Sequence, residues 1–161
     1  MVKNMNKALF LDRDGTINVD RDYVYKIEDF ILIEGVCDII KKYIQEGYLV
    51  IVVTNQSGVG RGLFSEDDVK KLQDYADILL STHGVKINKW YYCPHHPVYG
   101  IGKYKKNCNC RKPKTGMIEK AIEDFNIDVN NSLLVGDKED DIKCGEKMGI
   151  KSVYIDEFLK M

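Results

Sequence analysis

The sequence predicts a single α/β domain with a mainly parallel, doubly wound sheet. Short apolar runs of strand length alternate along the chain with segments whose apolar residues recur every three or four positions. Neighbouring strand candidates are not joined by tight turns, which favours crossover helices and parallel pairing. A length of 161 residues is typical of one domain, so we expect residues 1–161 to form one unit.

Five segments are strand candidates because each is short and apolar. Residues 8–11 end at Asp12, and residues 48–53 end at Thr54. Both runs have the composition of strands that are buried on both faces, as in parallel sheets. Three further candidates are residues 90–92, 132–135 and 152–155.

Amphipathic segments between these strands predict four helices. Each has one apolar stripe with spacings of three and four, and the stripes lie in residues 36–44, 69–80, 117–125 and about 140–148. Ser65 precedes three acidic residues, so it is a suitable N-cap for the second helix. Gly47 and Gly84 follow two of the helices, where glycine favours termination.

Charge and hydropathy favour a cytoplasmic protein. The net charge of −1 gives no general reason to expect nucleic acid or membrane as a partner. The apolar runs are far shorter than the roughly 20 residues of a membrane span, and residues 1–7 are not followed by the apolar region of a signal peptide. We expect a monomer, because no exposed apolar stripe requires a partner.

Carboxylates follow two strand candidates, at the edge where parallel sheets bind ligands. Asp12 and Asp14 are two residues apart, which places both on one side of an extended segment. Asp137 follows the run 132–135. Carboxylates this close raise each other's pKa unless a cation lies between them. Asp12, Asp14 and Asp137 together would suit Mg²⁺, whereas a plain turn at Asp14-Gly15 is the alternative interpretation.

Residues 93–110 contain two pairs of soft metal ligands. Cys93-x-His95 and Cys108-x-Cys110 supply four ligands, a set that suits a structural Zn²⁺ ion. His96 is a second candidate ligand, but symmetry between the two pairs favours His95. Unpaired buried cysteines are the alternative interpretation for the set.

The same part of the chain is basic. Residues 78–118 contain no acid and carry a charge of +8, which leaves −9 for the rest of the chain. A solvated surface and a binding region for an anion both fit this charge. Zinc would fix the loop whose next residues are Arg111 and Lys112. We expect Cys37 and Cys144 to be buried and unpaired.

The acidic motifs resemble those of the haloacid dehalogenase (HAD) superfamily of phosphohydrolases. The matching residues, in order, are Asp12-x-Asp14-Gly15-Thr16, Thr54-Asn55, Lys112 and Gly136-Asp137-x-x-x-Asp141. The resemblance implies a Rossmann-like HAD fold with Asp12 as the nucleophile and Asp14 as the general acid and then base. It further implies that Thr54 and Lys112 bind the phosphoryl group, and that Asp12, Asp137 and the Asp14 carbonyl hold Mg²⁺.

Within the superfamily, four segments resemble the heptose 1,7-bisphosphate 7-phosphatases. These segments are D-R-D-G-T-I-N, T-N-Q-S-G-V-G-R-G, C-P-H-H-P and C-N-C-R-K-P-K-T-G-M. The resemblance implies a sugar bisphosphate substrate and a place in nucleotide-activated heptose biosynthesis. The substrate contacts that it implies are Asp20, Tyr23, Asn55, Gln56, Ser57, Arg111 and Lys138. The chain departs from that family at Arg21-Asp22, where the family commonly has His-Gly, and by ending soon after its fifth expected strand.

The segment between Asp12 and Gly35 is too short for a cap domain, so we expect an open, capless pocket. Gly58, Gly60 and Gly62 lack the ending of a P-loop, and we interpret them as a flexible turn. Three other functions fit part of the pattern. They are a histidinol-phosphate phosphatase, a phosphate-sensing regulatory module and a zinc-containing nucleic-acid binder. The last of these would stack bases on aromatic residues 90–92, Tyr99 and Tyr104.

Overall fold

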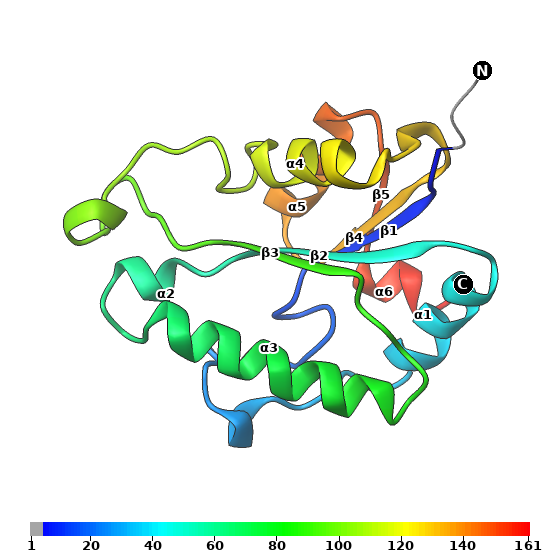
Figure 1. The fold of residues 1–161 in the computed structure, drawn as a ribbon, viewed down its shortest axis with the longest axis horizontal. Coiled ribbons are helices and arrows are strands. Elements are labelled where there is room, and N and C mark those ends of the chain that lie inside the picture. Colours follow the sequence, from blue (N-terminus) through cyan, green and yellow to red (C-terminus); the bar gives the residue numbers. More distant parts are fainter. Residues whose placement is uncertain (1–4) are drawn as a thin grey trace.

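The computed structural model describes residues 5–161 as a five-stranded sheet with helices on both faces (Figure 1). The strand order is β3-β2-β1-β4-β5, and every neighbouring pair is parallel. The strands are β1 Ala8–Leu11, β2 Leu49–Asn55, β3 Lys89–Cys93, β4 Leu133–Gly136 and β5 Lys151–Tyr154. The predicted doubly wound parallel sheet is therefore confirmed.

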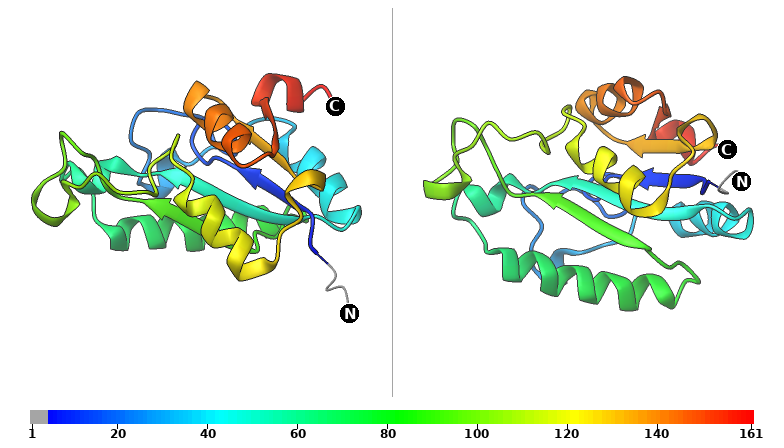
Figure 2. Two further views of the ribbon diagram at one scale, coloured as in Figure 1. Left: turned by 90° about the horizontal axis from the view of Figure 1, so that it is seen from above. Right: turned by 45° about the horizontal axis from the view of Figure 1, so that its top comes forward.

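Alternating side chains of the central strand pack into two different cores. Leu9 and Leu11 belong to the larger core, whereas Ala8 and Phe10 face the other side of the sheet. Figure 2 shows α3 and α4 on opposite faces of the sheet. The helices are α1 Val36–Gln45, α2 Ser57–Gly60, α3 Glu66–Ser81, α4 Gly116–Phe125, α5 Glu139–Lys147 and α6 Ile155–Phe158. Short 3-10 turns occur at Ile27–Asp29, Gly102–Tyr104 and Val129–Asn131.

The predicted helix ends agree with the structure. Ser65 accepts a hydrogen bond from the backbone amide of Asp68 at 3.0 Å, and the Asp68 carboxylate accepts one from the Ser65 amide at 2.9 Å. This reciprocal pair is a capping box at the start of α3. Gly47 and Gly84 have φ of 91° and 74°, the left-handed conformation in which glycine ends a helix.

Three local predictions need correction. Strand β2 runs to Asn55 because its ladder with β3 continues to the Asn55–Cys93 pair, so Thr54 lies within the strand. Residues 57–60 form a single-turn helix where a flexible turn was expected, because α2 packs closely on its surroundings. A Cβ on Gly60 would clash with the Pro94 carbonyl oxygen, at 2.5 Å. Ile155 was expected in the last strand but begins α6.

The segment after β3 extends past α2 at the carboxyl edge of the sheet (Figure 1). The Gly60 amide donates to the Pro94 carbonyl at 3.1 Å, and the Ile101 amide donates to the Gly60 carbonyl at 2.7 Å. These two bonds attach the loop to α2. Within residues 5–161, no helix is long and apolar enough to cross a membrane. Residues 1–4, part of the segment in which no signal peptide was expected, lie outside the described residues.

Candidate active site

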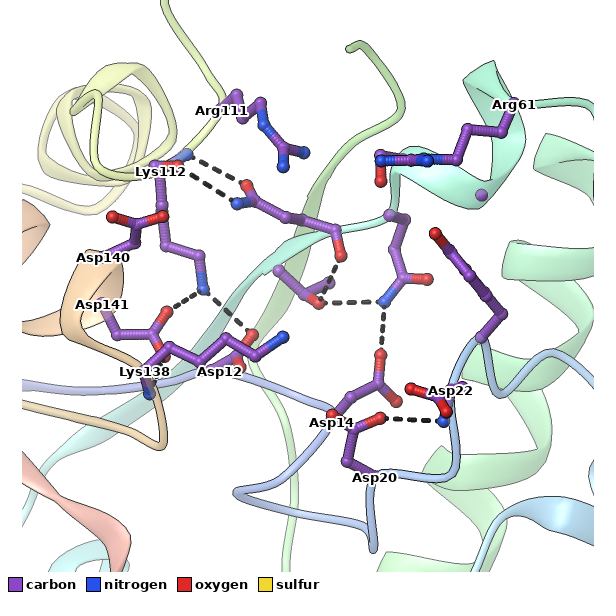
Figure 3. A pocket seen from close by; sticks show the side chains of 16 residues that line it. Asp12, Asp14, Asp20, Asp22, Arg61, Arg111, Lys112, Lys138, Asp140 and Asp141 are labelled. Atoms are coloured by element: carbon purple, nitrogen blue, oxygen red, sulfur yellow. Dashed lines mark hydrogen bonds and ion pairs between the residues drawn. The ribbon is translucent and has the colours of Figure 1, made fainter. Parts of the chain in front are cut away.

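A pocket of about 350 Å³ opens at the carboxyl edge of the sheet (Figure 3). The residues that line it include every predicted catalytic and substrate-binding residue. These are Asp12, Asp14, Asp20, Tyr23, Thr54, Asn55, Gln56, Ser57, Arg111, Lys112 and Lys138. These residues come from the segments at or after the carboxyl ends of four strands, β1, β2, β3 and β4. One edge of the sheet thus brings together residues from much of the chain.

Lys112 occupies the floor of the pocket between two carboxylates (Figure 3). Its Nζ lies 2.9 Å from Asp12 Oδ1 and 2.6 Å from Asp141 Oδ1. Nζ also donates to the Val53 carbonyl at 2.7 Å. Lys112 is only 3% exposed, so this charge depends on its partners rather than on water.

Burial and neighbouring charge shift the pKa values of this ion pair. Burial raises the pKa of Asp12 to about 7, although the attraction of Lys112 opposes this shift. Burial acts in the opposite direction on Lys112, but the charges of Asp12 and Asp141 outweigh it and raise the lysine pKa. Lys112 therefore stays cationic at neutral pH. Its charge does not fully offset the effect of burial on the neighbouring Asp12 carboxylate.

The side chain of Asn55 holds the backbone of Lys112 at the end of β2. Asn55 Oδ1 accepts from the Lys112 amide at 3.0 Å, and Asn55 Nδ2 donates to the Lys112 carbonyl at 3.2 Å. This pair of hydrogen bonds joins residues that are 57 positions apart. The Asn55 amide is thus already engaged in positioning Lys112, although Asn55 also lines the pocket.

Asp14 accepts hydrogen bonds from three side chains. Arg13 donates from Nε to Oδ1 at 3.1 Å and from Nη2 to Oδ2 at 3.0 Å. Asn18 donates to Oδ1 at 2.9 Å, and Gln56 donates to Oδ2 at 3.0 Å. Gln56 Nε2 also lies 3.0 Å from Thr54 Oγ1, so Gln56 links Asp14 to Thr54.

Three carboxylates form what we call the acidic cluster: Asp12, Asp137 and Asp141. Their ligand oxygens lie within 4.8 Å of one another. The cluster includes Asp141 rather than the side chain of Asp14, which sequence reasoning had grouped with Asp12 and Asp137. Asp141 Oδ2 accepts from the backbone amides of Asp137 and Lys138 at 3.2 and 3.1 Å, so Asp141 also holds the start of α5. The four-residue spacing from Asp137 was the only sign of this role in the sequence.

The acidic cluster fits a divalent cation. Asp137 Oδ1 is buried and has no hydrogen-bond partner within residues 5–161. Burial and the charge of Asp141 raise the pKa of Asp137, and a cation would relieve both effects. Gly15 has φ of 87°, and a Cβ there would overlap the Asp137 carboxylate. Glycine at this position therefore lets the turn after β1 approach Asp137.

Two arginines border the outer part of the pocket (Figure 3). Arg61 Nε and Arg111 Nη1 are buried and have no hydrogen-bond partner in the described part of the chain. The Arg61 guanidinium also lies 4.5 Å from the centroid of the Tyr99 ring. Both side chains thus have unused donors, which suits them to an anionic group.

The loop of residues 20–23 forms another part of the pocket wall. Asp20 Oδ1 accepts from the Asp22 amide at 3.2 Å. Asp22 and Tyr23 both have positive φ, 53° and 57°, a conformation that L-residues seldom adopt. Asp20 and Tyr23 are exposed, so their side chains are accessible to a ligand from this loop.

Four soft ligands lie together in what we call the thiol cluster: Cys93, His95, Cys108 and Cys110. Their donor atoms lie within 4.8 Å of one another. Cys93 Sγ lies 3.5 Å from Cys108 Sγ, and Cys110 Sγ lies 3.4 Å from His95 Nδ1. Three sulfurs and one imidazole nitrogen that converge in this way fit a tetrahedral Zn²⁺ ion.

The other histidine and the other cysteines have different environments. His96 Nδ1 accepts from the Val98 and Tyr99 amides at 3.1 and 3.0 Å, so the structure places His95 and not His96 in the thiol cluster. Cys37 and Cys144 are buried free thiols, as predicted.

Comparison with known proteins identifies close relatives. A HAD-hydrolase-like family model matches residues 109–157. A D-glycero-beta-D-manno-heptose-1,7-bisphosphate 7-phosphatase of Haemophilus influenzae is 49% identical over 141 residues, which are 88% of this chain and 76% of the relative. The D-glycero-alpha-D-manno-heptose-1,7-bisphosphate 7-phosphatase of Burkholderia mallei is 50% identical over 150 residues, 93% of this chain and 79% of the relative.

A solved structure of a relative is also similar to this chain. The D,D-heptose 1,7-bisphosphate phosphatase from B. bronchiseptica, complexed with magnesium and phosphate, is similar with a TM-score of 0.81 and 30% identity. The match covers 91% of this chain and 78% of that one.

Proposed function

The chain belongs to the family of D-glycero-D-manno-heptose-1,7-bisphosphate 7-phosphatases among the HAD-like hydrolases, and on this premise we propose that it removes the 7-phosphate from that sugar. The observation that carries the proposal is the buried Asp12–Lys112 ion pair at the floor of an open pocket. The proposal covers both anomers, because relatives named for the beta and the alpha sugar match at 49% and 50% identity.

In the first step, Asp12 attacks the phosphorus atom of the 7-phosphate. A new bond forms between a carboxylate oxygen and phosphorus, and the bond from phosphorus to the sugar oxygen breaks with its electron pair left on that oxygen. Asp14 donates a proton to the departing oxygen, which is worth about 10²- to 10⁴-fold in rate. Lys112 and Thr54 bind the phosphoryl oxygens, and Lys112 offsets the repulsion between the two anions.

In the second step, water attacks the phosphorus atom of the aspartyl phosphate. Asp14 now takes a proton from this water, while the Asp12 carboxylate leaves and is regenerated. We propose that Asp12, Asp137 and the backbone carbonyl of Asp14 hold Mg²⁺. When bound, Mg²⁺ supplies Lewis-acid stabilisation of the charge on the phosphoryl group.

We assign the second phosphate of the substrate to Arg111. Arg111 lines this pocket, and the fork of N–H groups on a guanidinium suits a phosphate. Asp20, Tyr23, Ser57 and Lys138 line the same pocket as this arginine and Asp12, which suits them to the sugar. Asn55 and Gln56 contribute by holding Lys112 and Asp14.

The thiol cluster is proposed to hold a structural Zn²⁺ ion through Cys93, His95, Cys108 and Cys110. Cys110 directly precedes Arg111 and Lys112, so fixing the cluster fixes the backbone that carries both cations. We further propose that the protein acts as a cytoplasmic monomer. Free thiols favour a reducing compartment.

The aromatic residues of β3 give no support to the nucleic-acid alternative. Trp90 Nε1 donates to Asp77 at 2.8 Å, and the Tyr91 hydroxyl donates to Asp124 at 2.6 Å. These partners are acidic and would repel a phosphate backbone. The family membership likewise favours the heptose substrate over histidinol phosphate.

A panel of phosphomonoesters tests the proposed function. Phosphate release is measured with heptose 1,7-bisphosphate, heptose 7-phosphate, histidinol phosphate and a 3′-phosphorylated oligonucleotide. We expect the bisphosphate to have a kcat/KM at least about 10-fold above the others, because it alone carries a second phosphomonoester, a dianion that Arg111 can bind. Phosphorus NMR should show that the 1-phosphate remains. A higher kcat/KM for histidinol phosphate would contradict the substrate assignment.

A further inference from the structure

Arg13 is the largest fully buried side chain in the described part of the chain, and it is charged. Only 1% of it is exposed. Removing a guanidinium from water is costly unless its donors are well paired. Arg13 Nη1 nevertheless has no hydrogen-bond partner in residues 5–161. The burial of Arg13 is therefore not explained by a gain in the stability of the fold.

The remaining donors of Arg13 bind both oxygens of Asp14 side by side. Nε reaches Oδ1 at 3.1 Å, and Nη2 reaches Oδ2 at 3.0 Å. Two parallel bonds from a rigid planar group fix the plane of a carboxylate, whereas one bond leaves it free to rotate. The other donors to Asp14 are the neutral amides of Asn18 and Gln56, each of which contacts a single oxygen. Arg13 contacts both oxygens, which constrains the plane of the Asp14 carboxylate in the pocket.

The same guanidinium also contacts the loop that carries Asp20 and Tyr23. Nη2 donates to the backbone carbonyl of Val24 at 2.6 Å. Val24 is buried and directly follows Asp22 and Tyr23, the two residues with positive φ. One rigid group thus connects Asp14 with the end of a loop whose backbone conformation is unfavourable by itself.

We propose that Arg13 is a positioning residue that holds the Asp14 carboxylate in the orientation needed to pass a proton to the departing sugar oxygen. This inference rests on the proposed function, because it needs Asp14 to act as the acid. Charge neutralisation of Asp14 alone would require only a cation, which a lysine also provides. Positioning requires the bidentate contact, in which two nitrogens of one planar group bind the two carboxylate oxygens, and a lysine does not provide it.

The test compares two leaving groups in Arg13→Gln and Arg13→Lys variants. The measured quantity is kcat/KM, which includes every step up to loss of the alcohol. Heptose 1,7-bisphosphate has a poor alkoxide leaving group that needs the Asp14 proton, whereas p-nitrophenyl phosphate releases a phenolate that does not. We expect Arg13→Gln to lower kcat/KM by about 10²-fold for the bisphosphate and by less than about 3-fold for the aryl ester. Arg13→Lys should show the same selectivity, with a loss of about 10-fold for the bisphosphate.

Controls separate this inference from folding and from the proposed function. Asp14→Asn should show the same dependence on leaving group with a larger loss. If Arg13→Gln does not fold, as judged by thermal melting, the Arg13→Lys ratio decides the question. Equal losses on both substrates in a folded variant, or no loss in Arg13→Lys, would overturn the positioning role. If wild type and Asp12→Asn release phosphate equally slowly, the proposed function fails instead.

Discussion

The acidic cluster and the thiol cluster lie near the same edge of the sheet, but they differ in ligand chemistry and in access. The acidic cluster offers hard oxygen atoms, one of which has no partner among the described residues, beside the lysine at the floor of the pocket. The thiol cluster offers three sulfurs and one nitrogen that contact one another. None of its four residues lines the active-site pocket.

The difference fits the proposal that two metal ions serve different purposes at one edge of the sheet. A hard site with room for a phosphate suits chemistry on the substrate. A closed soft site suits structure, and here it adjoins Arg111 and Lys112 in the chain. If this contrast is correct, damage to the acidic cluster should remove the reaction itself. Damage to the thiol cluster should only displace the groups that assist it.

The largest effect is expected from Asp12→Asn in the acidic cluster. An amide cannot form the aspartyl phosphate, so we expect kcat to fall by about 10⁴-fold or more. The fold should survive, because Lys112 keeps its ion pair with Asp141. Phosphate release and thermal melting measure the two properties. Substantial activity in the folded variant would reject Asp12 as the nucleophile.

Brief chelation is expected to distinguish the two clusters. Dilute EDTA should lower activity by about 10³-fold, because the charge on the phosphoryl group loses its divalent partner. Added Mg²⁺ should restore the activity in full while the zinc content, measured by mass spectrometry, stays at one per chain. Activity that returned only with Zn²⁺ would reverse the roles of the two clusters.

Cys108→Ser is expected to have an intermediate effect. Loss of one thiolate should release the zinc and loosen the segment before Lys112, lowering kcat by about 10- to 100-fold. Cys37→Ser is the matched control, because Cys37 is also buried but lies in α1, outside the thiol cluster. It should keep both zinc and activity. A zinc-free Cys108→Ser protein with full activity would separate the thiol cluster from the active site.

The smallest effect concerns Glu66, which joins α3 to the loop. It accepts hydrogen bonds from the Tyr92 and Tyr104 hydroxyls at 2.7 and 2.8 Å, and these bonds lower the pKa of Glu66 from its ordinary value near 4.5. A lowered pKa in the folded state stabilises the fold above the unfolded-state pKa, and this gain is lost as pH falls through the folded-state value.

Glu66→Gln should therefore lower Tm at neutral pH but not in acid. We expect a decrease of at most about 2 °C at pH 7, since a partly exposed carboxylate contributes little. The difference from wild type should shrink as pH falls below 4.5 and should disappear below the lowered pKa of Glu66, where the carboxylate of the wild type is also neutral. Melting curves at both pH values measure this effect. An equal difference in acid would show that the charge of Glu66 is not involved.

The parallel sheet and most of the pocket were predictable because they depend on local patterns. Apolar runs and helical stripes located the strands and helices, and parallel strands bring their carboxyl ends to one edge. This is why Asp12, Asp137 and Lys112 could be grouped although they lie far apart in the chain. The metal ligands of the thiol cluster were predictable for a similar reason, because Cys93-x-His95 and Cys108-x-Cys110 are local sequence patterns.

The contacts among the grouped residues were not predictable, because they depend on side-chain directions. No local pattern shows that Lys112 lies between Asp12 and Asp141, or that Asn55 holds its backbone. Arg13 could equally have been a surface residue, and its fork on Asp14 follows only from the fold of the turn after β1. The glycines of α2 were misinterpreted because their role is close packing, which a sequence pattern does not show.

The most direct test of the account is to trap the phosphoryl group on the protein. Enzyme mixed with the sugar bisphosphate and Mg²⁺ is quenched in acid within one turnover, and its peptides are examined by mass spectrometry. The account predicts that the peptide containing Asp12 gains the mass of one phosphoryl group, and that Asp12→Asn abolishes this gain. A phosphoryl group on any other residue, or rapid turnover with no modified peptide at any quench time, would contradict it.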